Sequence, residues 1–188
     1  MIVLCSSSPR RKELFRALNL EFITQPANVD ESHFTHETVL EYLQRITISK
    51  AKPEPTSPNE LRISSDTIVV LENAIFQKPN SFEEAMNMLE QLNGKTHLVY
   101  SGICFLTSEL EIFEHETTEV TFQNFTKSEL ENYILTCKPY DKAGSYGIQD
   151  KPSLVQKISG SYTNILGFPI RTFFKHHELW SRFNNENR

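Results

Sequence analysis

The chain has few of the features that mark secreted or membrane-spanning proteins. Its three cysteines, Cys5, Cys104 and Cys137, are odd in number, form no CxxC pair and outline neither a disulfide framework nor a zinc ribbon. Such sparse cysteine usage indicates a reducing compartment, so we expect a cytoplasmic protein. The apolar runs, such as residues 68–71, are too short to span a bilayer, and the first residues lack the pattern of a signal peptide. We therefore expect no membrane partner.

Positive charge is also scarce. The 188-residue chain carries 19 Lys and Arg against 24 Asp and Glu, which gives a formal net charge of −5. A broad nucleic-acid surface usually needs an excess of Lys and Arg, so we expect no nucleic-acid partner. An anionic ligand would have to meet a local cluster of positive charge. A chain of this length can bury the core of one domain, or of two small lobes that share a sheet.

Strand-like and helix-like segments are interleaved along the chain. Short apolar or β-branched runs predict strands at residues 2–5, 21–24, 62–72, 75–76, 98–106, 111–122 and 154–158. Apolar spacing and N-cap residues predict helices from residues 9 and 38, after the capping boxes of residues 81–84 and 126–129, and over 170–183. In the last helix, Phe173, Phe174 and Trp180 are the expected core contacts. Without a strict βαβ repeat, this pattern favours an α/β protein with a mixed sheet.

The residues that follow the first predicted strand are SSSPRR, at positions 6–11. Ser8 is a suitable N-cap and Pro9 a suitable first residue of a helix. The start of such a helix offers free N–H groups to an anion, and the guanidinium groups of Arg10 and Arg11 can bind phosphate oxygens in pairs. An ordinary capped helix with a solvated basic first turn would explain the same residues.

Two acidic positions are candidates for chemistry. Asp66 lies within the otherwise apolar run of residues 63–70, where an ionised side chain is costly unless it is paired or binds a metal. An aspartate that faces water from an edge strand is the alternative. The pair Asp30-Glu31 precedes a predicted helix and is less specific, because acidic pairs in loops are usually solvated.

Other candidate residues have good structural explanations as well. Lys50 ends a predicted helix, where a cation suits the helix dipole, and Lys78 precedes Pro79 in a turn. The loop DKAGSYGIQD at 141–150 has two glycines and suggests close approach to a ligand, although a glycine-rich surface turn would look the same. The six histidines form no cluster with metal-ligand spacing, so we interpret them as structural or surface residues.

Taken in order, four blocks of the chain resemble the Maf family of nucleotide pyrophosphatases, also known as septum-formation-inhibitor-like proteins. They are LCSSSPRRKEL at 4–14, SDTIVV at 65–70 with QKP at 77–79, LEQLNGKTHLVYSG at 89–102, and DKAGSYGIQ at 141–149. The closing GSYTN at 160–164 and GFP at 167–169 also fit. The resemblance covers nearly the whole chain. It implies one Maf-like domain over residues 1–188, an elongated mixed sheet flanked by helices, and two lobes around a cleft, as in inosine triphosphatase-like proteins.

The resemblance also implies roles for single residues. The general base falls on Asp66, and the metal- or phosphate-binding residues on Ser7, Arg11, Glu31, Lys50 and Lys78, with Glu31 and Asp66 as the metal ligands. The positions that separate subgroups of the family fall on Arg10, Thr67 and Gln149. Arg, Thr and Gln there resemble the subgroup that acts on dTTP and UTP, whereas the subgroup that acts on 7-methyl-GTP tends to carry Trp, Gln and Glu.

The function implied by the resemblance is that of a house-cleaning hydrolase. It would convert dTTP and UTP to the monophosphate and pyrophosphate with Mg²⁺ or Mn²⁺, as a homodimer, and modified pyrimidine nucleotides are further candidate substrates. Two alternatives stay open: a nucleotide-binding regulator of cell division, and a pyrophosphatase of the same fold that prefers purines or 7-methyl-GTP. Ser65, Gln77 and Asp150 depart from the family's pattern, which has alanine, glycine and glycine at these positions.

Overall fold

The computed structural model describes residues 1–52 and 56–184 and contains a seven-stranded mixed sheet. The strand order is β2-β1-β3-β5-β6-β7, and β4 pairs with β3. The strands are β1 (Ile2–Leu4), β2 (Phe22–Thr24), β3 (Leu61–Leu71), β4 (Ala74–Phe76), β5 (Thr96–Leu106), β6 (Glu111–Phe122) and β7 (Val155–Ser159). β1 runs parallel to β2 and β3, whereas the β3–β4 and β6–β7 pairs are antiparallel. The mixed α/β sheet predicted from the sequence is therefore confirmed.

The chain divides into two compact units, which we call unit 1 and unit 2. Unit 1 comprises Met1–Asp66, Ser101–Glu116 and Gly167–Arg188, and unit 2 comprises Thr67–Tyr100 and Thr117–Leu166. Each unit has its own apolar cluster. The predicted cleft between two lobes stays a prediction.

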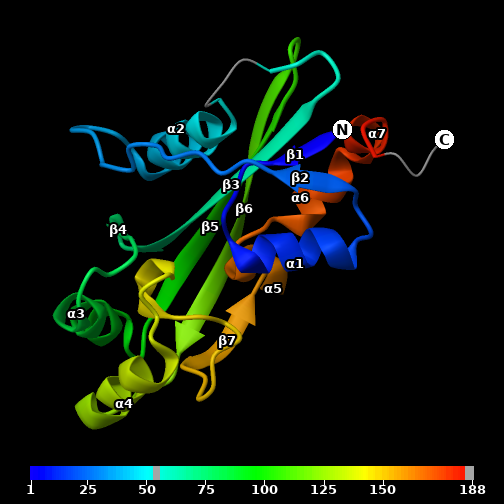
Figure 1. Ribbon diagram of the computed structural model, residues 1–188. Coiled ribbons are helices and arrows are strands. Elements are labelled where there is room, and N and C mark those ends of the chain that lie inside the picture. The colour runs from blue at the N-terminus through cyan, green and yellow to red at the C-terminus, as the bar shows by residue number, and fades with distance from the viewer. Residues whose placement is uncertain (53–55, 185–188) are drawn as a thin grey trace. The chain divides into compact units, whose positions relative to one another are not determined.

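Unit 1 packs helices against the N-terminal strands. Its helices are α1 (Pro9–Ala17), α2 (Val39–Ala51), α6 (Ile170–Lys175) and α7 (His177–Ser181). Figure 1 shows α1 following β1 and leading on to β2. The core contains Ile2, Leu4, Phe15, Leu61, Ile63, Ile103, Phe105, Phe168, Phe173 and Trp180, all buried. Phe15 lies between two aromatic neighbours, with its ring centroid 5.2 Å from that of Phe22 and 5.3 Å from that of Phe168.

Helix α2 begins with a complete capping box. The Thr38 hydroxyl accepts a hydrogen bond from the Glu41 N–H at 3.3 Å, and the Glu41 carboxylate accepts one from the Thr38 N–H at 2.8 Å. Two of the unpaired N–H groups at the helix start are thereby satisfied. Tyr42, Leu43 and Ile46 form its buried face. The position of Lys50 in the last turn follows from this start and this face.

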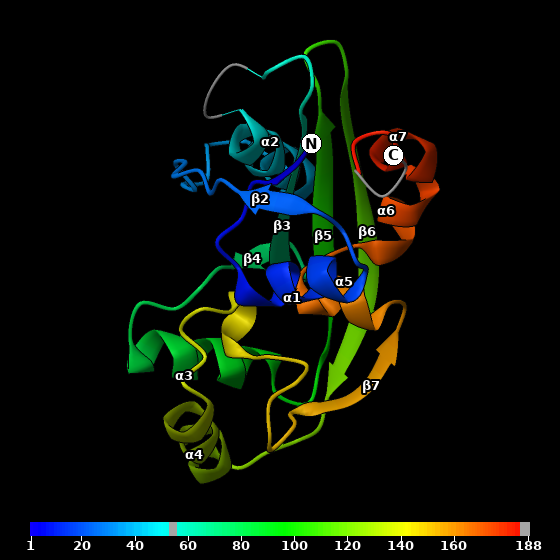
Figure 2. The same cartoon turned by 45° about the vertical axis from the view of Figure 1, so that its right-hand side comes forward.

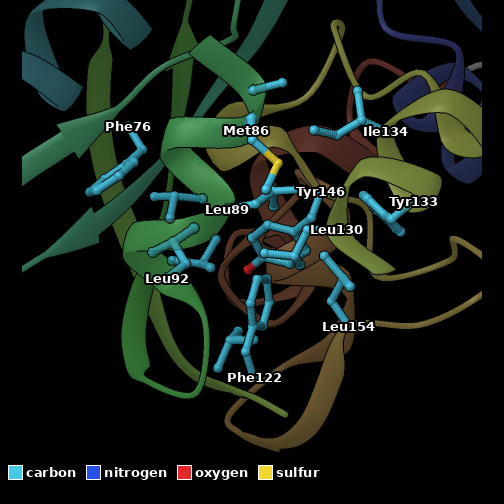
Figure 3. Close-up of a cluster of buried hydrophobic side chains, with 14 residues drawn as sticks. Phe76, Met86, Leu89, Leu92, Phe122, Leu130, Tyr133, Ile134, Tyr146 and Leu154 are labelled. Atoms are coloured by element: carbon cyan, nitrogen blue, oxygen red, sulfur yellow. The ribbon is translucent and has the colours of Figure 1, made fainter. Parts of the chain in front are cut away.

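Unit 2 is built around a second apolar cluster. Its helices are α3 (Phe82–Leu92), α4 (Lys127–Cys137), the short 3₁₀ helix η1 (Ala143–Ser145) and α5 (Tyr162–Leu166). The ribbons of α3 and α4 lie side by side in both Figure 1 and Figure 2. Figure 3 shows the cluster that they enclose, with Leu89 and Leu92 of α3 on one side of Tyr146 and Leu130 of α4 on the other. The loop that contains Tyr146 is therefore part of this core.

The C-terminal helix differs from its prediction. Instead of one helix over 170–183, the chain forms α6 and α7, joined at His176, whose φ of −100° and ψ of 29° are not helical. The Phe173 carbonyl accepts the Trp180 indole N–H at 2.9 Å and the His176 N–H at 3.2 Å. The rings of Phe173 and Trp180 stack with their centroids 4.7 Å apart. Stacking of Trp180 onto Phe173 thus bends the chain. Phe174 is 46% exposed, so it is not the core contact that was expected.

Two other local predictions were incomplete. At Ser81 the hydroxyl accepts the Glu84 N–H as predicted, but the Glu84 carboxylate accepts the Asn80 N–H at 2.5 Å instead of that of Ser81. Only half of that capping box forms, whereas the box of Thr126 and Glu129 is complete. Helix α5 was not predicted.

The state of the cysteines and the lengths of the helices can be read from the structure. All three cysteines lie in the described part of the chain and are free. Burial raises the pKa of the Cys5 thiol to about 11 and that of the Cys104 thiol to about 12, so both are inert apolar side chains at neutral pH. Across residues 1–52 and 56–184, none of the helices combines the length and the apolar character that a bilayer crossing needs.

Gly144 holds the loop of residues 141–150 against β3. Its N–H donates to the Gln77 carbonyl at 3.1 Å, and its φ is +68°. A Cβ at this position would lie 3.0 Å from three side-chain carbons of Val69. Gly144 therefore makes a close approach to the protein's own strand β3. The approach of this loop to a ligand stays a prediction.

Gly144→Ala should lower the free energy of unfolding by about 2 kcal/mol, because a side chain at positive φ is strained and the added methyl group overfills its site. Denaturant unfolding of Gly144→Ala, Val69→Ala and the double variant measures the effect. The two losses should not add, because Val69→Ala removes two of the three carbons that the new methyl group would meet. Strictly additive losses would contradict this account.

Candidate functional site

Ser6 organises the segment between β1 and α1. Its hydroxyl accepts the Ser8 N–H at 3.2 Å and a guanidinium N–H of Arg11 at 3.2 Å. Ser8 occupies the N-cap position as predicted, but its side chain makes no capping hydrogen bond. Ser7 is exposed between these two residues. Sequence reasoning missed Ser6, because its partner Arg11 is known only once the helix is in place.

Arg11 points from α1 toward acidic groups of unit 1. Its Nε–H donates to the Gly167 carbonyl at 2.7 Å. Burial lowers the pKa of Arg11 to about 10, and the carboxylates of Asp66 and Glu31 act in the opposite direction. The guanidinium group therefore stays charged at neutral pH and lies within electrostatic range of both carboxylates. Arg10 is near enough to add its own positive charge.

Ser65 supports the same carbonyl group. Its buried hydroxyl donates to the Gly167 oxygen at 3.2 Å, so this oxygen accepts from both Ser65 and Arg11. The alanine usual in the family could not make this bond. The departure at Ser65 thus adds a fixing point for the carbonyl that holds Arg11.

Lys50 joins the two predicted metal ligands. Its ammonium group donates to Asp66 Oδ1 at 2.5 Å and lies 2.7 Å from Glu31 Oε1. The side chains of Lys50 and Asp66 are only 12% and 13% exposed, whereas that of Glu31 is 43% exposed. Coulomb attraction between such shielded groups is stronger than between surface charges. The interaction of Lys50 with the helix dipole, which the sequence suggested, therefore does not account for its ion pairs with Asp66 and Glu31.

Asp66 lies on an interior strand. β3 lies between β1 and β5 in the sheet order, but its pairing with β1 covers residues 61–63 and its pairing with β4 covers residues 69–71, so neither pairing includes Asp66. The Asp66 side chain is only 13% exposed and pairs with Lys50, so it does not face water as the alternative supposed. Asp66 immediately follows Ser64 and Ser65, which are fully buried. The strand thus carries a carboxylate to the border of the unit 1 core, where Lys50 compensates its charge.

Arg45 and Tyr42 of α2 fix the loop that carries Glu31. The Tyr42 hydroxyl donates to the Glu31 carbonyl at 2.9 Å, and an Arg45 N–H donates to the Ser32 carbonyl at 2.9 Å. Arg45 also binds both oxygens of Glu37, at 2.6 and 2.8 Å, and its guanidinium carbon lies 3.8 Å from the ring centroid of Phe34. Sequence reasoning missed this cluster and also the capping box of Thr38 and Glu41 beside it.

The acidic pair before α2 is divided between two tasks. Asp30 is exposed, and its carboxylate accepts the Ser32 N–H at 2.9 Å and the Ser32 hydroxyl at 2.7 Å, which closes a local turn. Glu31 instead reaches Lys50. Only the second residue of the pair is therefore directed toward Asp66.

The acidic residues suit a divalent cation that also binds phosphate. Glu31 and Asp66 direct carboxylate oxygens at one ammonium group, and oxygen is the ligand that Mg²⁺ and Mn²⁺ prefer. Among residues 1–52 and 56–184, His, Cys, Asp and Glu form no group of three or more that could hold a metal. Two carboxylates are enough for Mg²⁺, which usually takes one or two from the protein and the rest from substrate phosphates and water.

The remaining predicted site residues belong to unit 2. Thr67 is half-buried on β3, two residues before Val69. Lys78 is exposed and lies between Gln77 and the buried Pro79. Gly144 contacts both Val69 and Gln77. The loop of residues 141–150 therefore lies against residues that are close in sequence to Thr67 and Lys78. Gln149 is exposed on this loop.

Three of the six histidines, His33, His97 and His176, make structural contacts. His97 is buried, and its Nε2 lies 2.8 Å from the Tyr146 hydroxyl. Burial lowers the pKa of His97 to about 4, so the ring is neutral at pH 7. His176 Nε2 lies 2.7 Å from the Glu114 carboxylate, and His33 stacks on Tyr42. These contacts agree with the interpretation drawn from the sequence.

Comparisons with known proteins agree with the resemblance described above. The family model for Maf-like protein matches residues 1–178. The dTTP/UTP pyrophosphatase of Leptospira interrogans serogroup Icterohaemorrhagiae serovar Lai (strain 56601) is 50% identical over 188 residues, which covers 100% of both chains. The dTTP/UTP pyrophosphatase of Koribacter versatilis (strain Ellin345) is 40% identical over 176 residues, which covers 93% of this chain and 91% of that protein.

Similarity to solved structures is weaker. The Staphylococcus aureus Ham1 protein matches with a TM-score of 0.46 and 14% identity, over 64% of this chain and 71% of that one. At this TM-score the similarity carries no weight for fold or function.

Proposed function

This chain belongs to the Maf family, and we propose that it hydrolyses dTTP and UTP to the monophosphate and pyrophosphate. Relatives that are 40–50% identical over nearly their full length carry this activity in their names. The observation in the structure that carries the proposal is the pairing of Lys50 with Asp66 and Glu31 beside the Arg11 guanidinium group. A triphosphate is strongly anionic, and this part of unit 1 combines cations for its oxygens with carboxylates for a metal and a base.

The predicted site residues of unit 1 each have a proposed role in this reaction. Arg11 and Lys50 bind phosphate oxygens, as guanidinium and ammonium groups do at phosphoryl-transfer sites. The exposed residue Ser7 offers its hydroxyl to the same phosphate oxygens. Glu31 and Asp66 would hold Mg²⁺ or Mn²⁺, which would neutralise phosphate charge and polarise the phosphoryl oxygens. The Gly167 carbonyl keeps the Arg11 side chain in place.

Asp66 is the proposed general base. Its carboxylate accepts a proton from a water molecule as the water oxygen attacks the α-phosphorus. The bond between the α-phosphorus and the bridging oxygen breaks, pyrophosphate leaves with the electron pair of that bond, and the proton passes from Asp66 to solvent. Ionic contacts with Lys50 orient the carboxylate for this step.

The residues of unit 2 have binding roles in the proposal. Lys78, which is exposed, binds phosphate. Gln149 reads the base, because its amide can donate to O4 and accept from N3–H of uracil or thymine. Thr67, together with Arg10 of unit 1, completes the set that distinguishes pyrimidines. Action as one domain over residues 1–188, a homodimer, residence in the cytoplasm and turnover of modified pyrimidine nucleotides stay predictions.

Purified protein with Mg²⁺ or Mn²⁺ should release pyrophosphate and monophosphate from dTTP and UTP faster than from CTP, GTP or 7-methyl-GTP. Chromatography of the products and a pyrophosphate assay across this panel measure the preference. Orthophosphate and a nucleoside diphosphate as first products would refute attack at the α-phosphorus. Binding of nucleotides without turnover would favour the regulator of cell division, and a preference for GTP or 7-methyl-GTP would favour the purine enzyme.

Asp66→Asn should lower kcat for UTP by about a hundredfold or more, because the amide cannot accept the proton of the attacking water. The matched control is Asp30→Asn, which alters an exposed carboxylate whose hydrogen bonds are local to its own turn. The control should keep nearly full activity. Circular dichroism confirms that both variants fold, and near-normal turnover by Asp66→Asn would remove Asp66 from its role.

Gln149→Glu should depress kcat/KM for UTP and dTTP by about tenfold or more relative to GTP, because a carboxylate can only accept and leaves the base oxygen without its donor. Metal dependence should not change. Values of kcat/KM for UTP, CTP and GTP in both proteins measure the effect. An equal loss with every nucleotide would show that Gln149 serves the loop and not the base.

A further inference from the structure

The side chain of Asp150 closes the turn from which Gln149 projects. Its Oδ2 atom accepts the Gly147 N–H at 2.9 Å and the Tyr133 hydroxyl at 2.5 Å. The Asp150 N–H donates to the Gly147 carbonyl at 3.1 Å, so main chain and side chain close the same turn. The Gly147 N–H also points at the Tyr133 oxygen, 3.1 Å away. Asp150, Gly147 and Tyr133 thus form a closed ring of hydrogen bonds.

Tyr133 ties this ring to the unit 2 core. It lies on α4, its side chain is buried, and Figure 3 shows it at the edge of the apolar cluster beside Ile134. Burial and the hydrogen bond to Asp150 raise the pKa of Tyr133 well above its usual value, so the hydroxyl keeps its proton and acts as a donor. The Asp150 carboxylate is therefore held from a rigid helix.

The other end of the turn is held independently. Tyr146 is buried in the middle of the cluster, and its hydroxyl lies 2.8 Å from His97 Nε2 on β5. Its ring also meets that of Phe122 edge-on, with centroids 4.7 Å apart. Residues 146–150 are thus fastened at one end by Tyr146 and at the other by Asp150.

Gly147 and Asp150 are also matched in shape. A Cβ at position 147 would lie 2.7–2.9 Å from the carboxylate atoms of Asp150, so the carboxylate occupies the space that a side chain at 147 would need. Between the two anchors, Ile148 is half-buried and Gln149 is exposed. The side chain that this anchored turn presents to solvent is therefore the one assigned to the base.

We infer that Asp150 is a positioning residue for base selection: it fixes the turn of residues 147–150 so that the Gln149 amide meets a pyrimidine in one orientation. This inference rests on the proposed function, in which Gln149 reads the base. A fixed amide distinguishes bases better than a mobile one, because a mobile side chain can also turn to suit a purine. Asp150 acts through Gln149 and does not itself touch the nucleotide.

The test compares Asp150→Ala, Asp150→Asn and Tyr133→Phe with the wild type. Calorimetry gives Kd for UMP and GMP, and steady-state kinetics give kcat/KM for UTP and GTP. In Asp150→Ala both preferences for the uracil nucleotide should fall by about tenfold, because the Gly147 N–H and the Tyr133 hydroxyl lose their shared acceptor. Asp150→Asn should retain most of the preference, since an amide oxygen can accept both bonds. Tyr133→Phe should cause a smaller loss, because the Gly147 bond remains.

An unchanged UMP-to-GMP ratio of Kd in Asp150→Ala overturns the inference. An equal loss for both nucleotides with a lowered Tm also overturns it, because Asp150 would then serve stability alone. Failure of the proposed function looks different: the wild type itself would release no pyrophosphate from UTP or dTTP. The binding ratio would still decide the role of Asp150, because UMP and GMP binding does not depend on turnover.

Discussion

The need to compensate the charge of Asp66 governs the arrangement of unit 1. An ionised carboxylate at the border of a buried interior strand is costly unless an opposite charge meets it. Lys50 meets it from the end of α2, and the same ammonium group also holds Glu31. Helix α2, strand β3 and the loop before α2 therefore have to converge on one point. That convergence brings two carboxylates and one ammonium group together, as the proposed triphosphate site requires.

Several contacts hold Lys50 and Glu31 in position relative to each other. The capping box of Thr38 and Glu41 sets where α2 begins, and thus where Lys50 lies in its last turn. Arg45, in the middle of the same helix, binds the loop that carries Glu31 through its guanidinium group, and Tyr42 binds this loop through its hydroxyl. One helix thus supplies the cation and also fixes the acidic loop that the cation pairs with. In unit 2 the loop of Gln149 is likewise held at two points. The Tyr133 hydroxyl binds Asp150 at one end, and Tyr146 contacts His97 at the other.

Features that depend on neighbours in sequence could be predicted, and features that depend on distant partners could not. The strands, the Thr126 capping box and the anomaly of Asp66 in an apolar run all have local signals. The contacts of Asp150 with Tyr133, and of Arg11 with Gly167, join residues 17 and 156 positions apart, and no local pattern marks them. The break between α6 and α7 was missed because the periodicity over 170–183 is helical, whereas the stacking of Trp180 on Phe173 decides the outcome. Residue roles came from family resemblance, because the chemistry of Lys50 or Lys78 cannot be read from composition.

The bond between Arg11 and Gly167 also bears on the order in which the chain can fold. Its partners are 156 positions apart, and unit 1 is assembled from three separate stretches, the last of which starts at Gly167. Unit 2 ends at Leu166, so all of its segments have been synthesised before that stretch appears. During synthesis, Arg11 therefore has no Gly167 acceptor until residue 167 has been added. Contacts of such high sequence separation form late and slowly. All the segments that pack the loop of Gln149 are consequently available to a nascent chain before the acceptor of Arg11 is.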